Sequence, residues 1–68
     1  MGLVQNIKIA CIRNGTSIVG LEDALGFARG TINRWDDKKP MYKRVVRTAR
    51  QLNCTVEDLV DGVDLEEE

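Results

Sequence analysis

Arg29, Asn33 and Arg34 are the residues of this sequence whose types and spacing best suit recognition chemistry. An arginine guanidinium can donate two hydrogen bonds to O6 and N7 of guanine, and an asparagine amide can pair with N6 and N7 of adenine. If residues 29–37 form a helix, its polar face presents these three side chains together with Asp37. An ordinary solvated helix face, with Arg34 paired to a following aspartate, is the alternative.

Few residues of this sequence are suited to catalysis. The 68 residues include no histidine, which excludes imidazole bases, catalytic triads and imidazole metal ligands. Cys11 and Cys54 form no paired motif, so reduced thiols are expected, with a single disulfide as the alternative. Glu57, Asp58 and Asp61 are close enough in sequence to bind a cation, but a solvated helix start is the favoured interpretation. We therefore expect a protein that is not an enzyme, with no metal site and no cofactor.

Charge is distributed unevenly along the chain, although the formal net charge is only -1. Residues 1–56 contain all ten lysines and arginines and four acidic residues, whereas residues 57–68 contain seven acidic residues and no basic one. A basic body with an acidic end points to a polyanionic partner for the body, and ordinary solubilising surface charge is the alternative. The first residues lack the apolar stretch of a signal peptide or membrane span, so a soluble, cytoplasmic protein without a membrane partner is expected.

Apolar residues recur with helical periodicity through almost the whole sequence, which predicts an all-α protein. Five helices are expected, at residues 3–14, 18–25, 29–37 and 42–52 and, lastly, between Thr55 and Gly62. They would form one domain at residues 1–62, followed by an acidic, flexible tail at residues 63–68. The residues expected to face inward are Leu3, Ile7, Ala10, Cys11, Ile18, Leu21, Leu25, Ile32, Trp35, Tyr42, Val45, Val46, Ala49, Leu52, Val56, Leu59 and Val60.

The helices expected at residues 18–25 and 29–37 are joined by only three residues, Gly26, Phe27 and Ala28. This spacing is typical of a helix-turn-helix, because glycine lets the backbone leave the first helix in a left-handed conformation. Apolar residues on both sides of the turn would hold the two helices at a steep angle. The opposite face of the second helix would then stay free for a partner.

Two blocks of the sequence resemble the lambda-repressor-like Cro/CI-type (XRE-type) helix-turn-helix family. The first block reads LEDALGFARGTINRW at residues 21–35, and the second reads PMYKRVVRTARQLNCT at residues 40–55. With these blocks in this order, the resemblance covers about residues 6–61. It implies a compact five-helix DNA-binding domain with the helix-turn-helix at the second and third helices.

The resemblance also implies roles for individual residues. Positions that meet base edges in the major groove in related proteins correspond here to Arg29, Gly30, Thr31, Asn33 and Arg34. Positions beside the DNA backbone correspond to Lys38, Lys39, Lys43 and Arg44. Such backbone contacts position a protein on the duplex without reading its sequence. Arg47 and Arg50 are expected to face solvent.

The expected function is that of a small transcriptional regulator of the phage repressor, Cro or prophage-control type, acting as a homodimer on double-stranded DNA. Ala28 departs from the family's usual Ser or Thr helix cap, and Glu22 stands where a small residue is common. The alternative is a protein-binding module on the same fold, antirepressor or antitoxin-like, whose partner surface would be formed by Ile9, Ile12, Val19 and the acidic tail. A wider buried arc on the first helix would account equally well for Ile9 and Ile12.

Overall fold

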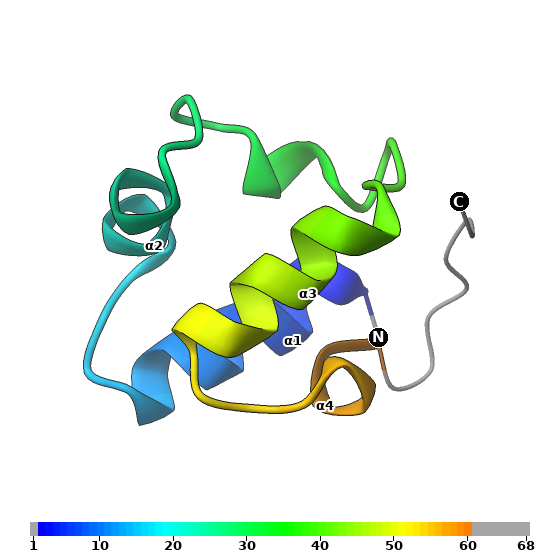
Figure 1. The fold of residues 1–68 in the computed structure, drawn as a ribbon. Helices are drawn as coiled ribbons and strands as arrows, with labels where there is room; N and C mark the ends of the chain where they lie inside the picture. The colour runs from blue at the N-terminus through cyan, green and yellow to red at the C-terminus, as the bar shows by residue number, and fades with distance from the viewer. Residues whose placement is uncertain (1, 61–68) are drawn as a thin grey trace.

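Helices and turns make up residues 2–60, the part of the chain that the computed structural model describes. Four α-helices and one 3-10 helix follow one another: α1 (Leu3–Arg13), α2 (Ile18–Leu25), η1 (Ile32–Arg34), α3 (Tyr42–Gln51) and α4 (Val56–Val60) (Figure 1). The expected all-α class is therefore confirmed for these residues. The expected end of the last helix at residues 61–62 and the acidic tail at residues 63–68 lie outside the described part of the chain.

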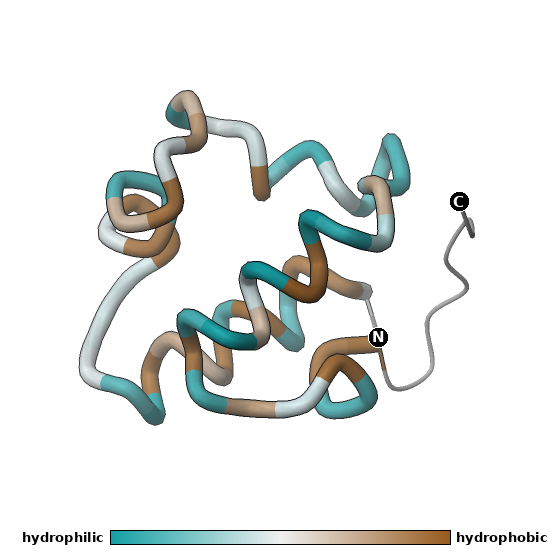
Figure 2. Tube along the Cα trace, viewed as in Figure 1, coloured by the Kyte–Doolittle hydropathy of each residue, from teal (hydrophilic) through white to brown (hydrophobic). Residues whose placement is uncertain are grey.

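The helices surround a single apolar core. α1 packs against α2, η1 and α4, and α3 packs against α2 and α4. In Figure 1, α2 lies to the left of α3, the green stretch that contains η1 passes above α3, and α4 lies below it. Hydrophilic residues are frequent along α3 and in the stretch after η1 (Figure 2). None of the helices within residues 2–60 has the length and apolar character needed to cross a membrane.

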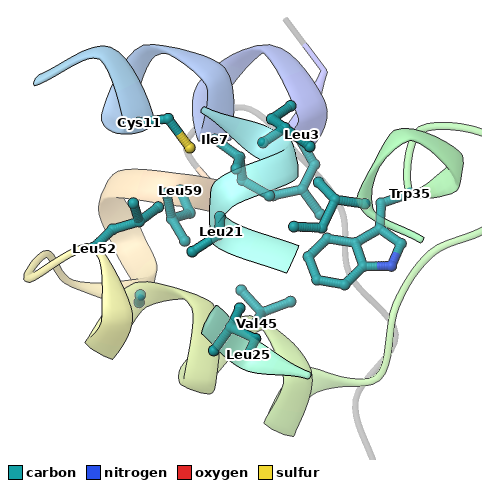
Figure 3. Packing of buried hydrophobic residues seen from close by; sticks show 12 residues of the cluster. Leu3, Ile7, Cys11, Leu21, Leu25, Trp35, Val45, Leu52 and Leu59 are labelled. Carbon is teal, nitrogen blue, oxygen red and sulfur yellow. The ribbon is translucent and has the colours of Figure 1, made fainter. Parts of the chain in front are cut away.

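Twelve buried apolar side chains, drawn from every helix, form this core. All twelve are on the inward faces that the sequence predicted, and Figure 3 shows Trp35 directed into the same cluster as Leu3 and Val45. Tyr42 was expected inside but is exposed. Thr48, which the apolar pattern did not include, is fully buried, and its hydroxyl donates to the Arg44 carbonyl at 2.8 Å. That bond satisfies the hydroxyl without any partner from outside α3.

The ends of α2 follow the sequence signals closely. The Ser17 side chain accepts a hydrogen bond from the Gly20 N–H at 3.1 Å, so Ser17 rather than Thr16 is the N-cap. Gly26 ends α2 with a φ of 76°, a left-handed conformation that glycine adopts without steric penalty. The chain therefore leaves α2 at the residue where a helix-turn-helix was expected to turn.

The prediction of an α-helix over residues 29–37 is wrong. We call residues 29–38 the central segment; its only regular element is η1, three residues long. Gly30 has a φ of +88°, which is incompatible with a right-handed helix and interrupts one near its expected start. The Ile32 N–H also leaves the helical pattern, because it donates to a Glu22 carboxylate oxygen at 2.9 Å. A glycine with reversed φ and a side chain that captures backbone amides together replace the expected helix by turns.

Candidate nucleic-acid interface

Glu22 holds the first part of the central segment against α2. Its carboxylate accepts the Gly30 N–H at 3.2 Å and the Ile32 N–H at 2.9 Å, one on each oxygen. Only 1% of Glu22 is exposed to solvent. In the sequence alone, Glu22 is visible only as a departure from the family pattern. The missing cap at Ala28 was the available signal, since uncapped amides need an acceptor from elsewhere.

Asp36 ties the far part of the central segment to α1. Its Oδ1 accepts the Val4 N–H at 3.2 Å, so it acts as the cap that α1 lacks at Gly2. A Cβ at Gly2 would lie only 2.5 Å from that same oxygen, so a larger residue at this position would require the Asp36 side chain to shift. The central segment is thus held by a carboxylate near each end, one from α2 and one of its own.

The residues expected to meet base edges differ in their exposure. Arg29, Asn33 and Arg34 are exposed, whereas Gly30 and Thr31 are half-buried. The Thr31 hydroxyl donates to the Ala28 carbonyl at 2.6 Å and so is engaged within the turn. Three side chains with the right hydrogen-bonding groups therefore reach solvent from a segment whose backbone is fixed.

Arg29 and Arg34, the two arginines of the central segment, differ in whether an acidic side chain lies nearby. Arg29 lies 3.8 Å from the Asp23 carboxylate, with both side chains mostly in solvent. An exposed pair of this kind contributes little and is easily exchanged for another anion. Arg34 was alternatively expected to pair with a following aspartate, but it forms no ion pair with any residue of the described range 2–60. Its guanidinium is free to meet a ligand.

A basic hollow lies beside η1 and the start of α3. It is open to solvent, has a volume of about 350 Å³, and is lined by Thr31, Arg34, Trp35, Lys38, Lys39, Pro40, Met41 and Arg44. Four of these residues are cationic and none is acidic. The sequence-predicted backbone contacts Lys38, Lys39 and Arg44 are thus brought together with Arg34, whereas Lys43 is exposed outside the hollow. Clustered cations without a carboxylate favour binding of an anion.

Phe27 contacts two of the three arginines of α3, Arg44 and Arg47. The guanidinium of Arg44 lies 5.6 Å and that of Arg47 lies 5.4 Å from the centre of its ring, within the range of cation–π attraction. Arg47 also donates to the Leu25 carbonyl at 2.9 Å, and Trp35 meets the Phe27 ring edge-on at 6.0 Å. Arg47 is exposed, as predicted, but its contacts with Phe27 and with the Leu25 carbonyl were not predicted. Its spacing from Arg44, three residues along a helix that packs on α2, was the signal that it shares Arg44's face.

The three apolar residues of the predicted partner surface, Ile9, Ile12 and Val19, differ in their exposure. Ile12 is 71% exposed and Val19 is 43% exposed. Ile9 is half-buried and lines a second hollow, of about 400 Å³, between α1 and the turn from α3 to α4. Burial over a wider arc of α1 therefore accounts for Ile9 but not for Ile12.

Both cysteines are free thiols. Burial raises the pKa of the Cys11 thiol, and burial together with the negative charge of Asp58 raises the pKa of Cys54. A raised pKa keeps both thiols protonated at neutral pH, which disfavours nucleophilic attack and metal binding. Within residues 2–60 there is also no cluster of three or more potential metal ligands.

Comparison of the chain with protein-family models, curated proteins and solved structures finds no match. The resemblance to Cro/CI-type proteins therefore stays a prediction from sequence motifs.

Proposed function

We propose that this protein binds double-stranded DNA and acts as a small sequence-specific transcriptional regulator, phage repressor or Cro-like. In this proposal α2, the turn at residues 26–28 and the central segment together act in place of a helix-turn-helix, with the turns and η1 of the central segment where the second helix would lie. One observation carries the proposal: Arg34 lines a hollow with three further cationic and no acidic lining residues, and the same central segment exposes Arg29 and Asn33. Side chains able to read bases and side chains able to bind phosphates would then belong to one segment and the helix that follows it.

The proposed roles follow from side-chain chemistry. Arg29 and Arg34 would bind guanine and Asn33 would bind adenine in the major groove. Half-buried Gly30 would allow a close approach, and the Thr31 methyl group would contact a thymine methyl, since its hydroxyl is already bonded. Phosphates would be bound in the basic hollow by Lys38, Lys39 and Arg44, and by Lys43 beside it.

A homodimer is the proposed binding form. The central segment offers few base-reading side chains, so one copy recognises a short stretch of sequence. Two copies placed about 34 Å apart, one helical turn, would double the recognised sequence and give a near-palindromic site. Such a regulator would act in the cytoplasm of a prokaryotic cell.

The test compares two arginine substitutions that remove the same charge. Arg34→Ala should lower affinity for the selected duplex about 10- to 100-fold, the cost of losing a bidentate base contact. Arg50→Ala, on the exposed face of α3 outside the basic hollow, should have little effect. The duplex is first selected from a random pool, and affinity is measured by mobility shift at several salt concentrations. Absence of binding to any pooled duplex at low salt would contradict the proposal.

A protein-binding role on the same fold is the second candidate, favoured by the exposure of Ile12 at 71%. An apolar side chain so exposed suits a protein surface better than the DNA backbone. Ile12→Lys would abolish such binding while leaving duplex affinity unchanged or higher. Loss of duplex binding in this variant would argue instead that α1 takes part in the DNA complex.

A further inference from the structure

We infer that Glu22 is a positioning residue that fixes the conformation in which the central segment presents its base-reading side chains. This inference rests on the proposed function. Glu22 itself is 1% exposed and does not reach the DNA-facing surface. Its effect on recognition would be transmitted through the two backbone amides that it binds.

The two accepted hydrogen bonds bracket one residue. Glu22 binds the N–H of Gly30 at 3.2 Å and that of Ile32 at 2.9 Å, on either side of Thr31. Arg29 comes directly before this bracket and Asn33 directly after it. The direction in which both exposed side chains leave the backbone is therefore fixed by the same carboxylate.

Burying the Glu22 carboxylate costs free energy, and the two hydrogen bonds that it accepts must offset that cost. Moving a charge out of water is costly, and Glu22 forms no ion pair with any residue between 2 and 60. The two amides are what offsets that cost, because hydrogen bonds to a charged group are about twice as strong as neutral ones. The nearest local alternative is missing, since Ala28 has no side-chain acceptor.

Loss of the bracket would free a segment that has little regular structure of its own. Gly30 has access to both signs of φ, so its neighbours would sample several directions. Apparent affinity falls in proportion to the fraction of molecules in the binding-competent conformation. A variant that keeps the fold but loses the bracket should therefore bind duplex more weakly.

The experiment pairs Glu22→Gln with Glu57→Gln. Both changes remove one negative charge and keep side-chain size, but Glu57 is exposed on α4. In Glu22→Gln the side-chain amide would present its NH2 group to one of the two backbone amides, so one hydrogen bond is lost. Amide exchange should become about tenfold faster at whichever of Gly30 and Ile32 faces the NH2 group, the factor expected for losing one hydrogen bond to a charged group.

Amide exchange is followed by NMR, with the Val45 and Ala49 amides of α3 reporting on the rest of the fold, and duplex affinity is measured on the same samples. Affinity should fall about tenfold in Glu22→Gln, in line with the loss of the competent conformation. It should be unchanged or slightly higher in Glu57→Gln. Unchanged exchange at Gly30 and Ile32 in a folded Glu22→Gln would overturn the inference.

Failure of the inference and failure of the proposed function are distinguishable. Faster exchange with unchanged affinity would overturn the positioning role and leave DNA binding intact. A wild-type chain that binds no duplex would overturn the proposed function, and the positioning role with it.

If Glu22→Gln does not fold, amide exchange in the wild-type protein tests the inference instead. The Gly30 and Ile32 amides should then be protected at least about tenfold more than the Arg29 amide, which has no acceptor among residues 2–60. Equal exchange at the three amides would overturn the inference.

Discussion

α2 and the central segment are neighbours in the chain but reach their conformations by different means. α2 has a complete set of local signals: the Ser17 cap, an apolar stripe and the left-handed Gly26. The central segment is fixed by side chains, since Glu22 binds its first amides and Asp36 connects it to α1. The comparison shows that a short window of sequence determines the first region, whereas the second depends on side-chain contacts that join it to α2 and α1.

Burial of the central segment was nevertheless predicted well. Ile32 is fully buried and Trp35 is 5% exposed, as expected for the inward face of an α-helix that does not form. Residues three apart share a face in an α-helix and also in a 3-10 helix, which has three residues per turn. Apolar spacing therefore identifies the buried side chains without identifying the type of helix.

Removing the apolar anchor of the central segment should have the largest effect. Ile32→Ala leaves a cavity in the core and should lower the free energy of unfolding by about 2–5 kcal/mol. Urea unfolding followed by circular dichroism measures the change. Ile12→Ala is the matched control, and because that residue is 71% exposed its effect should stay within about 0.5 kcal/mol. Similar losses in both variants would mean that the central segment is not anchored in the core.

Gly30 distinguishes the observed conformation from the predicted helix by the sign of its effect. In a right-handed helix, Gly30→Ala would stabilise the protein by about 1 kcal/mol. With a φ of +88°, the added methyl group meets no neighbouring atom but forces a strained backbone, so a loss of about 1–2 kcal/mol is expected. Thermal unfolding of the variant against wild type gives the sign. If Gly30→Ala proved more stable than the wild type, the result would support the α-helix predicted from the sequence and contradict the observed conformation.

The residues that sequence reasoning missed share one property. Glu22 binds amides eight and ten residues further along, and Arg47 binds a carbonyl 22 residues before it. Their partners are set by how α2, the turn and α3 pack, and no periodicity within one helix encodes that packing. The exposure of the arginines and lysines was easier to predict, because a charged side chain stays in water in a helix or in a turn unless a partner pairs it.

The local character of α2 gives the smallest expected effect. Ser17→Ala removes the N-cap bond to Gly20 and should cost about 1 kcal/mol of unfolding free energy. Thr16→Ala is the matched control: Thr16 is also exposed and precedes the helix, but its hydroxyl is not the cap, so stability should change by less than about 0.5 kcal/mol.

The same variant also tests whether α2 and the central segment unfold separately. In Ser17→Ala the amides of the first turn of α2 should exchange faster, while the Gly30 and Ile32 amides keep their protection. Their acceptor, Glu22, lies in the second turn of α2, beyond the fraying end. Faster exchange at Gly30 and Ile32 in this variant would show that the two regions unfold together, and the contrast between a locally fixed helix and a segment held from outside would not hold.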